Sequence, residues 1–164
     1  ILGCGFTTAA IICDRQAYDT YGGSHTPADT WHTRDLNYIL QDVDNIVSIS
    51  GNEFTLQQGL YIIKWSCPEH RTYFMISRLR QNNSGNFSYF EDRSSQCYSK
   101  GGGHYDQAYT QGQSEILKQV GVCTYTIATR SSFSNSSTYA RGLGHNVSGH
   151  YNYYTYVTIL KGDL

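Results

Sequence analysis

Apolar residues recur along this chain with the two-residue period of β-strands, in short segments separated by turns. The stretch FTLQQGLYIIKWSCP, residues 54–68, holds two such segments on either side of a Gln-Gln-Gly turn. Gly, Asn and Ser interrupt the pattern elsewhere, as is typical of turns. The predicted strands are 7–17, 46–50, 53–56, 60–67, 71–80, 87–90, 95–99, 115–120, 123–130 and 151–161. This spacing predicts an all-β fold, an antiparallel sandwich of two sheets in a single domain covering residues 1–164.

The segments between the strands differ in composition. Gly51-Asn52 and Gly121 each separate two predicted strands, which indicates a hairpin at both places. Helical spacing of apolar residues occurs only in 35–42, where we expect a short strand or turn instead. The polar or glycine-rich segments expected to be loops are 81–86, 100–113 and 131–153.

The predicted strands also differ in how many apolar faces they have. Segment 60–67 alternates, with one apolar and one largely polar face, whereas the segments 7–17 and 151–161 are apolar on both faces. A two-layer sandwich covers only one face of each sheet, so the second face of these terminal strands is expected to contact another subunit. The candidate interface residues are Phe6, Ile12, Tyr154 and Tyr156.

Charge and hydropathy argue against several classes of partner. Twelve Lys and Arg face thirteen Asp and Glu, for a net charge of −1. Neither a nucleic acid nor an anionic membrane surface is therefore expected as the main partner. No apolar run approaches the ~18–20 residues that membrane insertion needs. The chain begins with Ile1 rather than Met, which we interpret as the start of the C-terminal fragment of a longer protein.

The cysteines and the glycosylation sequons carry little specific information. Five Cys at wide spacings, with no C-x-x-C motif, indicate buried free thiols more than a disulfide scaffold. The sequons matter only in a secreted eukaryotic protein, and whether any is occupied or any Cys pairs stays open. The four sequons begin at Asn82, Asn86, Asn135 and Asn146.

Two segments resemble a known superfamily. FTLQQGLYIIKW is similar to the F-x-L-x-x-G-x-Y signature of tumour-necrosis-factor (TNF) and complement-type globular heads, and YTYVTILKGDL is similar to their closing strand. Residues 30–71 resemble more specifically the heads that end viral, mostly bacteriophage, tail fibres and appendages. The matching residues are Trp31, Thr33, Arg34, Asp35, Leu36, Asn37, Asp42, Asp44, Ile46, Val47, Ser48, Ser50, Asn52, Phe54, Thr55, Leu56, Gly59 and Tyr61.

The resemblance implies a fold and an assembly. It implies a TNF-like jelly roll that forms a homotrimer, with the terminal strands in the sheet that faces the threefold axis. The close match covers about the first half of the chain, and it thins in 87–114 and 131–150. Those segments are where a family member would carry its own specificity.

No catalytic motif stands out, so we expect no enzyme activity, no catalytic residue and no cofactor. Asp42 and Asp44 are interpreted as capping a turn, and a calcium site that includes Asn45 is the alternative. Cys67 and His70 would supply only half of a zinc site. No metal site is predicted, although a cluster of axial His or Asp residues in a trimer stays an open alternative.

Aromatic and hydrogen-bonding side chains on the predicted loops suit carbohydrate recognition. The chain has 15 Tyr, and a Tyr ring loses little entropy on contact. The candidate ligand-binding residues are His104, Tyr105, Tyr109, Tyr139, Arg141, His145, His150 and Tyr151.

We therefore predict a homotrimeric receptor-binding head at the tip of a viral tail fibre or appendage. It would lie on the virion surface and bind a host cell-surface glycan or protein through its apical loops. The alternatives are a purely structural trimerisation cap and a secreted TNF- or complement-like head.

Overall fold

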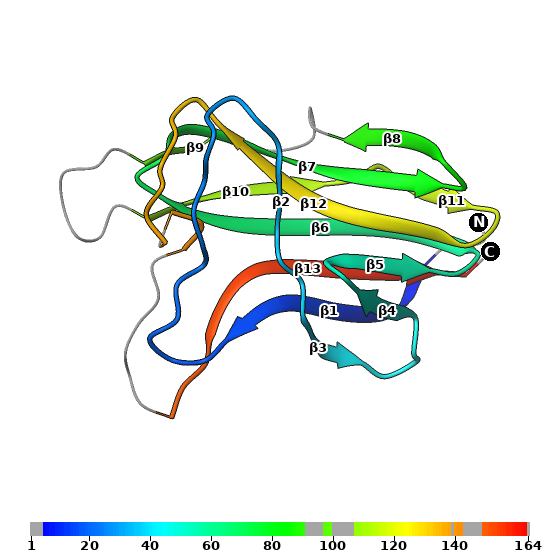
Figure 1. Ribbon diagram of the computed structural model, residues 1–164. Helices are drawn as coiled ribbons and strands as arrows, with labels where there is room; N and C mark the ends of the chain where they lie inside the picture. Colours follow the sequence, from blue (N-terminus) through cyan, green and yellow to red (C-terminus); the bar gives the residue numbers. More distant parts are fainter. Residues whose placement is uncertain (1–4, 91–96, 100–106, 139, 143–148, 164) are drawn as a thin grey trace.

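The computed structural model describes residues 5–90, 97–99, 107–138, 140–142 and 149–163. Within these residues the chain consists of β-strands and their connections (Figure 1), and no helix there could span a membrane. One sheet has six strands: β10 (Gln107–Gln113), β6 (Gly59–His70), β13 (Asn152–Gly162), β1 (Phe6–Gln16) and β3 (Tyr38–Asp42) in spatial order, with β11 (Leu117–Gln119) also beside β6. All of its pairs are antiparallel.

The second sheet has seven strands and lies against the first. Its spatial order is β4 (Val47–Ser50), β5 (Glu53–Leu56), β12 (Cys123–Ser131), β7 (Tyr73–Asn83) and β8 (Asn86–Phe90), with β2 (His32–Thr33) beside β12 and β9 (Cys97–Ser99) beside β7. The predicted all-β, two-sheet antiparallel sandwich is confirmed.

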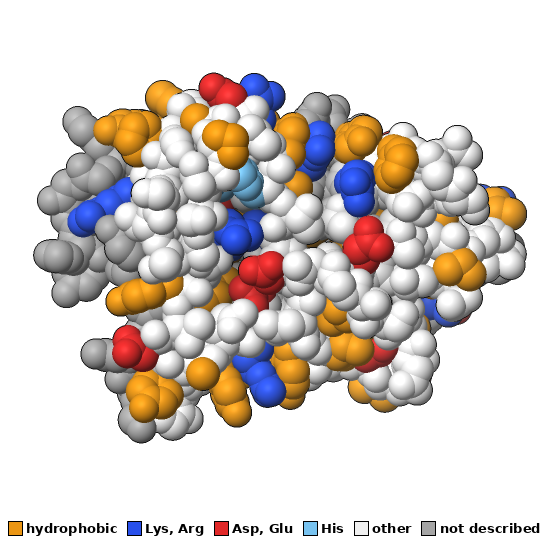
Figure 2. Space-filling model, viewed as in Figure 1, with side chains coloured by type: hydrophobic (Ala, Val, Ile, Leu, Met, Phe, Trp, Pro, Cys, Tyr) orange, Lys and Arg blue, Asp and Glu red, His pale blue; other side chains and the backbone are white. Residues whose placement is uncertain are grey.

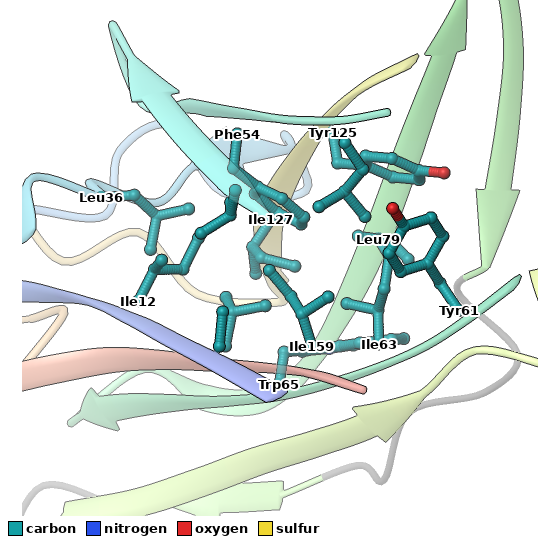
Figure 3. Packing of buried hydrophobic residues seen from close by; sticks show 14 of the residues in the cluster. Ile12, Leu36, Phe54, Tyr61, Ile63, Trp65, Leu79, Tyr125, Ile127 and Ile159 are labelled. Carbon is teal, nitrogen blue, oxygen red and sulfur yellow. The ribbon is translucent and has the colours of Figure 1, made fainter. Parts of the chain in front are cut away.

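The core lies between the two sheets and is filled by the alternating residues that the sequence pattern marks. Tyr61, Ile63 and Trp65 of β6 point toward Phe54 and Tyr125 of the other sheet (Figure 3), and all five side chains are buried. The rings of Phe54 and Tyr125 stack at 5.3 Å between centroids. This interior buries the apolar surface that drives folding.

The turn before β5 forms as the sequence predicts. Gly51 and Asn52 have φ values of 56° and 67°, and β4 pairs with β5 across them. Two successive positive φ angles are the geometry that Gly and Asn tolerate best in a two-residue hairpin. The carboxylate of Asp42 accepts hydrogen bonds from the backbone N–H groups of Ile46 (2.8 Å) and Val47 (3.1 Å), so it caps the preceding turn as interpreted from the sequence.

Two predictions about connections are wrong. The segment 107–113, expected as a loop, is the edge strand β10, whose outward residues are polar. Residues 115–130 do not form a hairpin, because β11 pairs with β6 in one sheet and β12 pairs with β5 and β7 in the other. The chain crosses between sheets near Gly121, where the Gln119 amide donates to the carbonyl oxygens of Leu56 (2.5 Å) and Gly121 (2.8 Å).

A register shift changes the alternation at the start of β13. Cys13 pairs with Tyr156, but Arg15 pairs with Tyr153, so β13 has one extra residue at this point. Tyr153 is consequently 37% exposed, whereas Tyr154 is 3% exposed. Strict alternation along 151–161 would put Tyr153 on the face of the buried Val157, and the extra residue turns it to the exposed side instead.

The two ends of the sandwich are different. β1 begins and β13 ends at one end, where Phe6 pairs with Gly162. The connections that contain residues 17–31, 132–138 and 140–142 gather at the opposite end (Figure 1). His25 and Asn135 join these connections through two backbone hydrogen bonds, of 2.8 and 2.7 Å.

Candidate functional site

The outer face of the six-stranded sheet carries an apolar patch, defined as Ala9, Ile11, Ile62 and Leu160. Cross-strand register places Ala9, Leu160 and Ile62 in one row over β1, β13 and β6, and Ile11 follows in the next row. These residues alternate with core residues, so they point away from the interior, and each is only half-buried. A contiguous apolar patch of this kind is suited to packing against a protein surface.

A polar groove lies on the same face, beside the apolar patch. Its volume is about 470 Å³, and it follows β13, β6 and β10. Ser66 and Thr158 are short, so the longer side chains around them leave the face hollowed. The lining residues are Lys64, Trp65, Ser66, Gln111, Gly112, Gln113, Tyr156 and Thr158. An ammonium, two amides, hydroxyls and one tyrosine ring therefore surround the groove.

The four candidate interface residues lie in different environments. Phe6 is 36% exposed and Tyr156 is half-buried on the outer face. Ile12 is fully buried in the core of the chain itself, and the Tyr154 hydroxyl donates to the Thr20 carbonyl from a buried position. Ile12 and Tyr154 therefore have no exposed surface with which to contact a second subunit, and the neighbouring Ile11 is a better candidate.

The described loop candidates lie at the end opposite the chain termini, and most are exposed. Tyr109 is 51% exposed and its hydroxyl accepts a hydrogen bond from the Gln107 amide. Tyr151 is 50% exposed, with the Arg15 guanidinium carbon 4.3 Å from the centre of its ring. His150 is also exposed. The other candidates, His104, Tyr105, Tyr139 and His145, lie outside the described residues.

Arg141 has a structural role at this end. Its Nη1 donates to the Thr33 carbonyl (3.0 Å), and its own carbonyl accepts from Nη2 of Arg34 (2.6 Å). The guanidinium also passes so close to Gly23 (φ +98°) that a Cβ there would lie 2.7 Å from Nη2. Arg141 therefore fixes the loop conformation, and it is a weaker ligand candidate than the exposed tyrosines.

A buried ion pair between Arg34 and Glu69 lies in the interior next to the loop-bearing end. Nη1 of Arg34 lies 2.9 Å from Oε1 of Glu69, and both side chains are almost fully buried. Thr155 accepts from Nε of Arg34, and Thr129 donates to the same Glu69 oxygen. Burial raises the pKa of Glu69 to about 7, although Arg34 opposes the shift. The described residues give Oε2 of Glu69 no hydrogen-bond partner.

His25 is the second buried ionisable group at this end. Its ring is fully buried and lies 4.3 Å from the His32 ring, centre to centre. Neither ring nitrogen makes a well-formed hydrogen bond with a described residue. Burial lowers the pKa of His25 by more than the Thr129 backbone raises it. Burial, and then the nearby His32 and Arg34, lower the pKa of His25 to about 4. The ring is therefore neutral at pH 7.

The sequence analysis missed this polar cluster. From the sequence, Arg34 is identified only as part of a family motif. No role is assigned there to Glu69, which stands between Pro68 and His70. A long charged side chain in a strand gives no sign of whether it faces the core. The one available signal was that β6 continues its alternation beyond Cys67, which places Glu69 on the inner face with Trp65.

The described cysteines are unpaired, as the sequence analysis expected. Cys13, Cys67 and Cys123 are buried, and Cys97 is intermediate. Burial raises the pKa of Cys67 to about 12, so its thiol stays protonated. In the described part of the chain, no three His, Cys, Asp or Glu side chains come together as metal ligands.

Comparison with known proteins establishes the fold. No family model and no curated protein matches the sequence. Among solved structures, murine APRIL at pH 8.0 has a TM-score of 0.56 at 9% identity, covering 94% of this chain and 99% of that one. Murine APRIL at pH 5.0 has a TM-score of 0.54 at 10% identity over the same shares. The PRD1 vertex protein P5 has a TM-score of 0.51 at 16% identity, covering 97% of this chain and 99% of that one.

These similarities define the class of fold. APRIL is a TNF-family protein, and the chain therefore has the TNF-like jelly roll that the sequence resemblance implied. The same fold includes the vertex protein of a phage, PRD1. At these identities the similarity establishes the fold alone.

Proposed function

We propose that this chain is a homotrimeric receptor-binding head of a viral attachment structure, at the tip of a tail fibre or vertex appendage. It would act on the virion surface and bind a host-surface glycan or protein. The observation that carries the proposal is the arrangement of two distinct surfaces on one sandwich: an apolar patch on an outer sheet face, and exposed aromatic residues at the loop-bearing end. The fold similarity to a phage vertex protein supports the viral setting.

Assembly would use the outer face of the six-stranded sheet. Ile11, Ile62 and Leu160 point outward and are only half-buried, so three copies packed around an axis would bury them further. Phe6 and Tyr156 lie on the same strands and would extend the contact. Apolar burial gives roughly 25 cal/mol per Å², and cross-strand pairing places Ala9, Leu160 and Ile62 side by side, so one contact can bury them together.

Recognition would use the loop-bearing end of the sandwich, opposite the end where β1 begins and β13 ends. Tyr109, His150 and Tyr151 are exposed there and offer ring faces and hydrogen-bonding groups. Tyrosine rings stack on the C–H faces of sugars and also suit protein contacts. Three copies of a weak site on one trimer would raise the overall affinity through effective concentration, without a strong single contact. The proposal includes no catalytic activity and no cofactor.

Cell binding by loop variants tests the proposal. Tyr109→Ala and Tyr151→Ala together should reduce binding of the labelled protein to host cells while the trimer mass stays unchanged. Val120→Ala is the matched control, because Val120 is 79% exposed but follows β11 near the other end. Undiminished binding by the Tyr variants would contradict recognition at this end. A wild-type trimer that binds no host cell would instead indicate a structural cap.

A further inference from the structure

The outer face of the seven-stranded sheet carries a row of stacked arginine and aromatic side chains. The guanidinium carbon of Arg78 lies 4.0 Å from the centre of the Trp31 ring and 4.5 Å from that of Tyr89. Arg80 lies over Phe87 at 5.2 Å. We call these five residues the arginine–aromatic ridge. Figure 2 shows hydrophobic and basic side chains alternating in this way over the region of β7 and β8.

Strand register explains why these residues meet. Arg78 and Arg80 are two residues apart on β7, and Phe87 and Tyr89 are two residues apart on β8, so all four point to the same outer face. Arg80 is paired directly with Tyr89. Successive outward residues on one strand are roughly 6.6 Å apart. Four of the five ridge residues are therefore held by two regular strands, and Trp31 joins them from the connection before β2.

A flat strip of small side chains borders the ridge. On the neighbouring strand β12, Thr124, Thr126 and Ala128 are paired with Asn82, Arg80 and Arg78 of β7. Thr55 of β5 continues the row beyond Thr124. Thr124 and Thr55 are half-buried, whereas Thr126 and Ala128 are buried, so the accessible hydroxyls beside the ridge are those of Thr124 and Thr55. A ligand lying along the cross-strand row of Phe87, Asn82, Thr124 and Thr55 would contact the ring at one end and the two hydroxyls at the other.

The ridge combines exposed rings with an accessible cation. Phe87 and Tyr89 are 49% and 48% exposed. Arg80 is also paired with Glu53, but at 3.4 Å and with side chains that are 32% and 40% exposed. That distance is longer than the roughly 2.7–2.9 Å of a tight charge-assisted contact, and exposed pairs of this kind are weak. A carboxylate on a ligand can therefore take the place of Glu53.

We propose that the arginine–aromatic ridge is a second binding site, which takes a sugar that carries a carboxylate. The rings of Phe87 and Tyr89 stack on the sugar, Arg80 pairs with its carboxylate, and Thr124 and Thr55 contact its hydroxyls. Two arginines and one glutamate make this surface locally positive, whereas the whole chain carries −1, and this complementarity favours an acidic sugar over a neutral one. The site lies on the other sheet from the apolar patch, and it does not depend on the loop residues or on trimer formation.

Binding of galacturonic acid oligomers tests the proposal, with the methyl esters of the same oligomers as neutral controls. Calorimetry with the whole chain should show binding of the acid that weakens with salt, and weaker binding of the ester. Arg80→Gln should lower the affinity about tenfold. Glu53→Gln should raise it, by up to about fivefold, because it removes the competing carboxylate.

A matched control lies on the same sheet face. Arg130 and Asp29 form a similar exposed pair at 3.5 Å, outside the ridge, so Arg130→Gln should leave the affinity unchanged. Equal binding of acid and ester, or an equal loss in Arg80→Gln and Arg130→Gln, would overturn the proposal. So would a failure to bind both these oligomers and sialic acid oligomers. Concentration-dependent association that Phe87→Ser abolishes, without sugar binding, would assign the ridge to protein contact instead and also overturn it.

Discussion

Nη1 of Arg34 and Oε1 of Glu69 lie 2.9 Å apart in the interior of the sandwich, and each side chain is at most 2% exposed. The pair joins the β2–β3 connection to the end of β6, and Arg34 also reaches the Arg141 carbonyl in the loop-bearing end. A buried charged contact therefore helps to hold the loop-bearing end in place.

Breaking this ion pair on one side should be costly. Arg34→Met leaves the Glu69 carboxylate buried without its cation, and it should lower the free energy of unfolding by about 3–5 kcal/mol. Replacing both partners, as Arg34→Met with Glu69→Leu, should recover at least half of that loss, because no charge is left buried. Urea unfolding at one fixed protomer concentration measures both variants. A double variant as unstable as the single one would contradict this. It would show that the loss of stability comes from the lost hydrogen bonds to Thr155 and Thr129 and not from the buried charge.

His25 should make the protein less stable in acid. Its pKa is about 4 in the folded chain and near 6.5 when unfolded, so the unfolded chain takes up the proton first. The contribution of the neutral His25 ring to the free energy of unfolding is therefore complete above pH 6.5. It falls by about 2–3 kcal/mol as the pH is lowered toward 4. His25→Leu should remove this part of the pH dependence, measured as unfolding free energy between pH 7 and pH 4. His150→Leu, at an exposed histidine, should retain it.

Glu69 should have the opposite pH dependence. Its pKa is raised to about 7 in the folded chain, so the folded state holds the proton more tightly than the unfolded state does. The stability contributed by this proton is present below pH 4.5 and is lost as the pH rises through 7. Glu69→Gln should therefore gain stability relative to the wild type between pH 5 and pH 8. A difference that does not change with pH would contradict the raised pKa.

Gly112 should not tolerate a side chain. A Cβ at this position would lie 2.1 Å from Cζ2 of Trp65, and the indole is held by a 2.8 Å hydrogen bond from its Nε1 to Ser77. Gly112→Ala should lower the melting temperature, at a cost of about 1–3 kcal/mol from overpacking. Gly121→Ala is the control, because no heavy atom beyond its two chain neighbours lies within 4 Å of its Cβ position, and it should change stability little. Equal effects would contradict the packing described for Trp65.

The sequence predicts the sandwich well where side chains alternate strictly. In segment 60–67 the alternate residues Tyr61, Ile63, Trp65 and Cys67 lie in the core, and the Gly51-Asn52 turn has the φ angles its residues favour. These features depend on local chemistry, which the sequence shows directly. The edge strand β10 was not predicted, because its sequence is mostly polar. A strand at the edge of a sheet buries few of its side chains and therefore needs few apolar residues.

Features that depend on distant pairing could not be predicted in the same way. The extra residue in β13 opposite Cys13 and Arg15 exists only when β1 and β13 are paired, and it exchanges the exposures of Tyr153 and Tyr154. The contact between Trp31 and Arg78 joins two residues that are 47 positions apart. For the candidate sites, the sequence identified residue types suited to recognition, but it could not separate the structural Arg141 from the exposed Tyr109 and Tyr151.

The most direct test of the central claim is the oligomeric mass of the chain in solution, measured by light scattering coupled to size exclusion. The wild type is predicted to have three times the 18.5 kDa mass of the chain. Ile62→Asp, in the apolar patch, should reduce that mass. Ile76→Asp should not, because Ile76 is also a half-buried isoleucine but lies on the outer face of the other sheet. A monomeric wild type, or a trimer that Ile62→Asp leaves intact, would contradict assembly through this face.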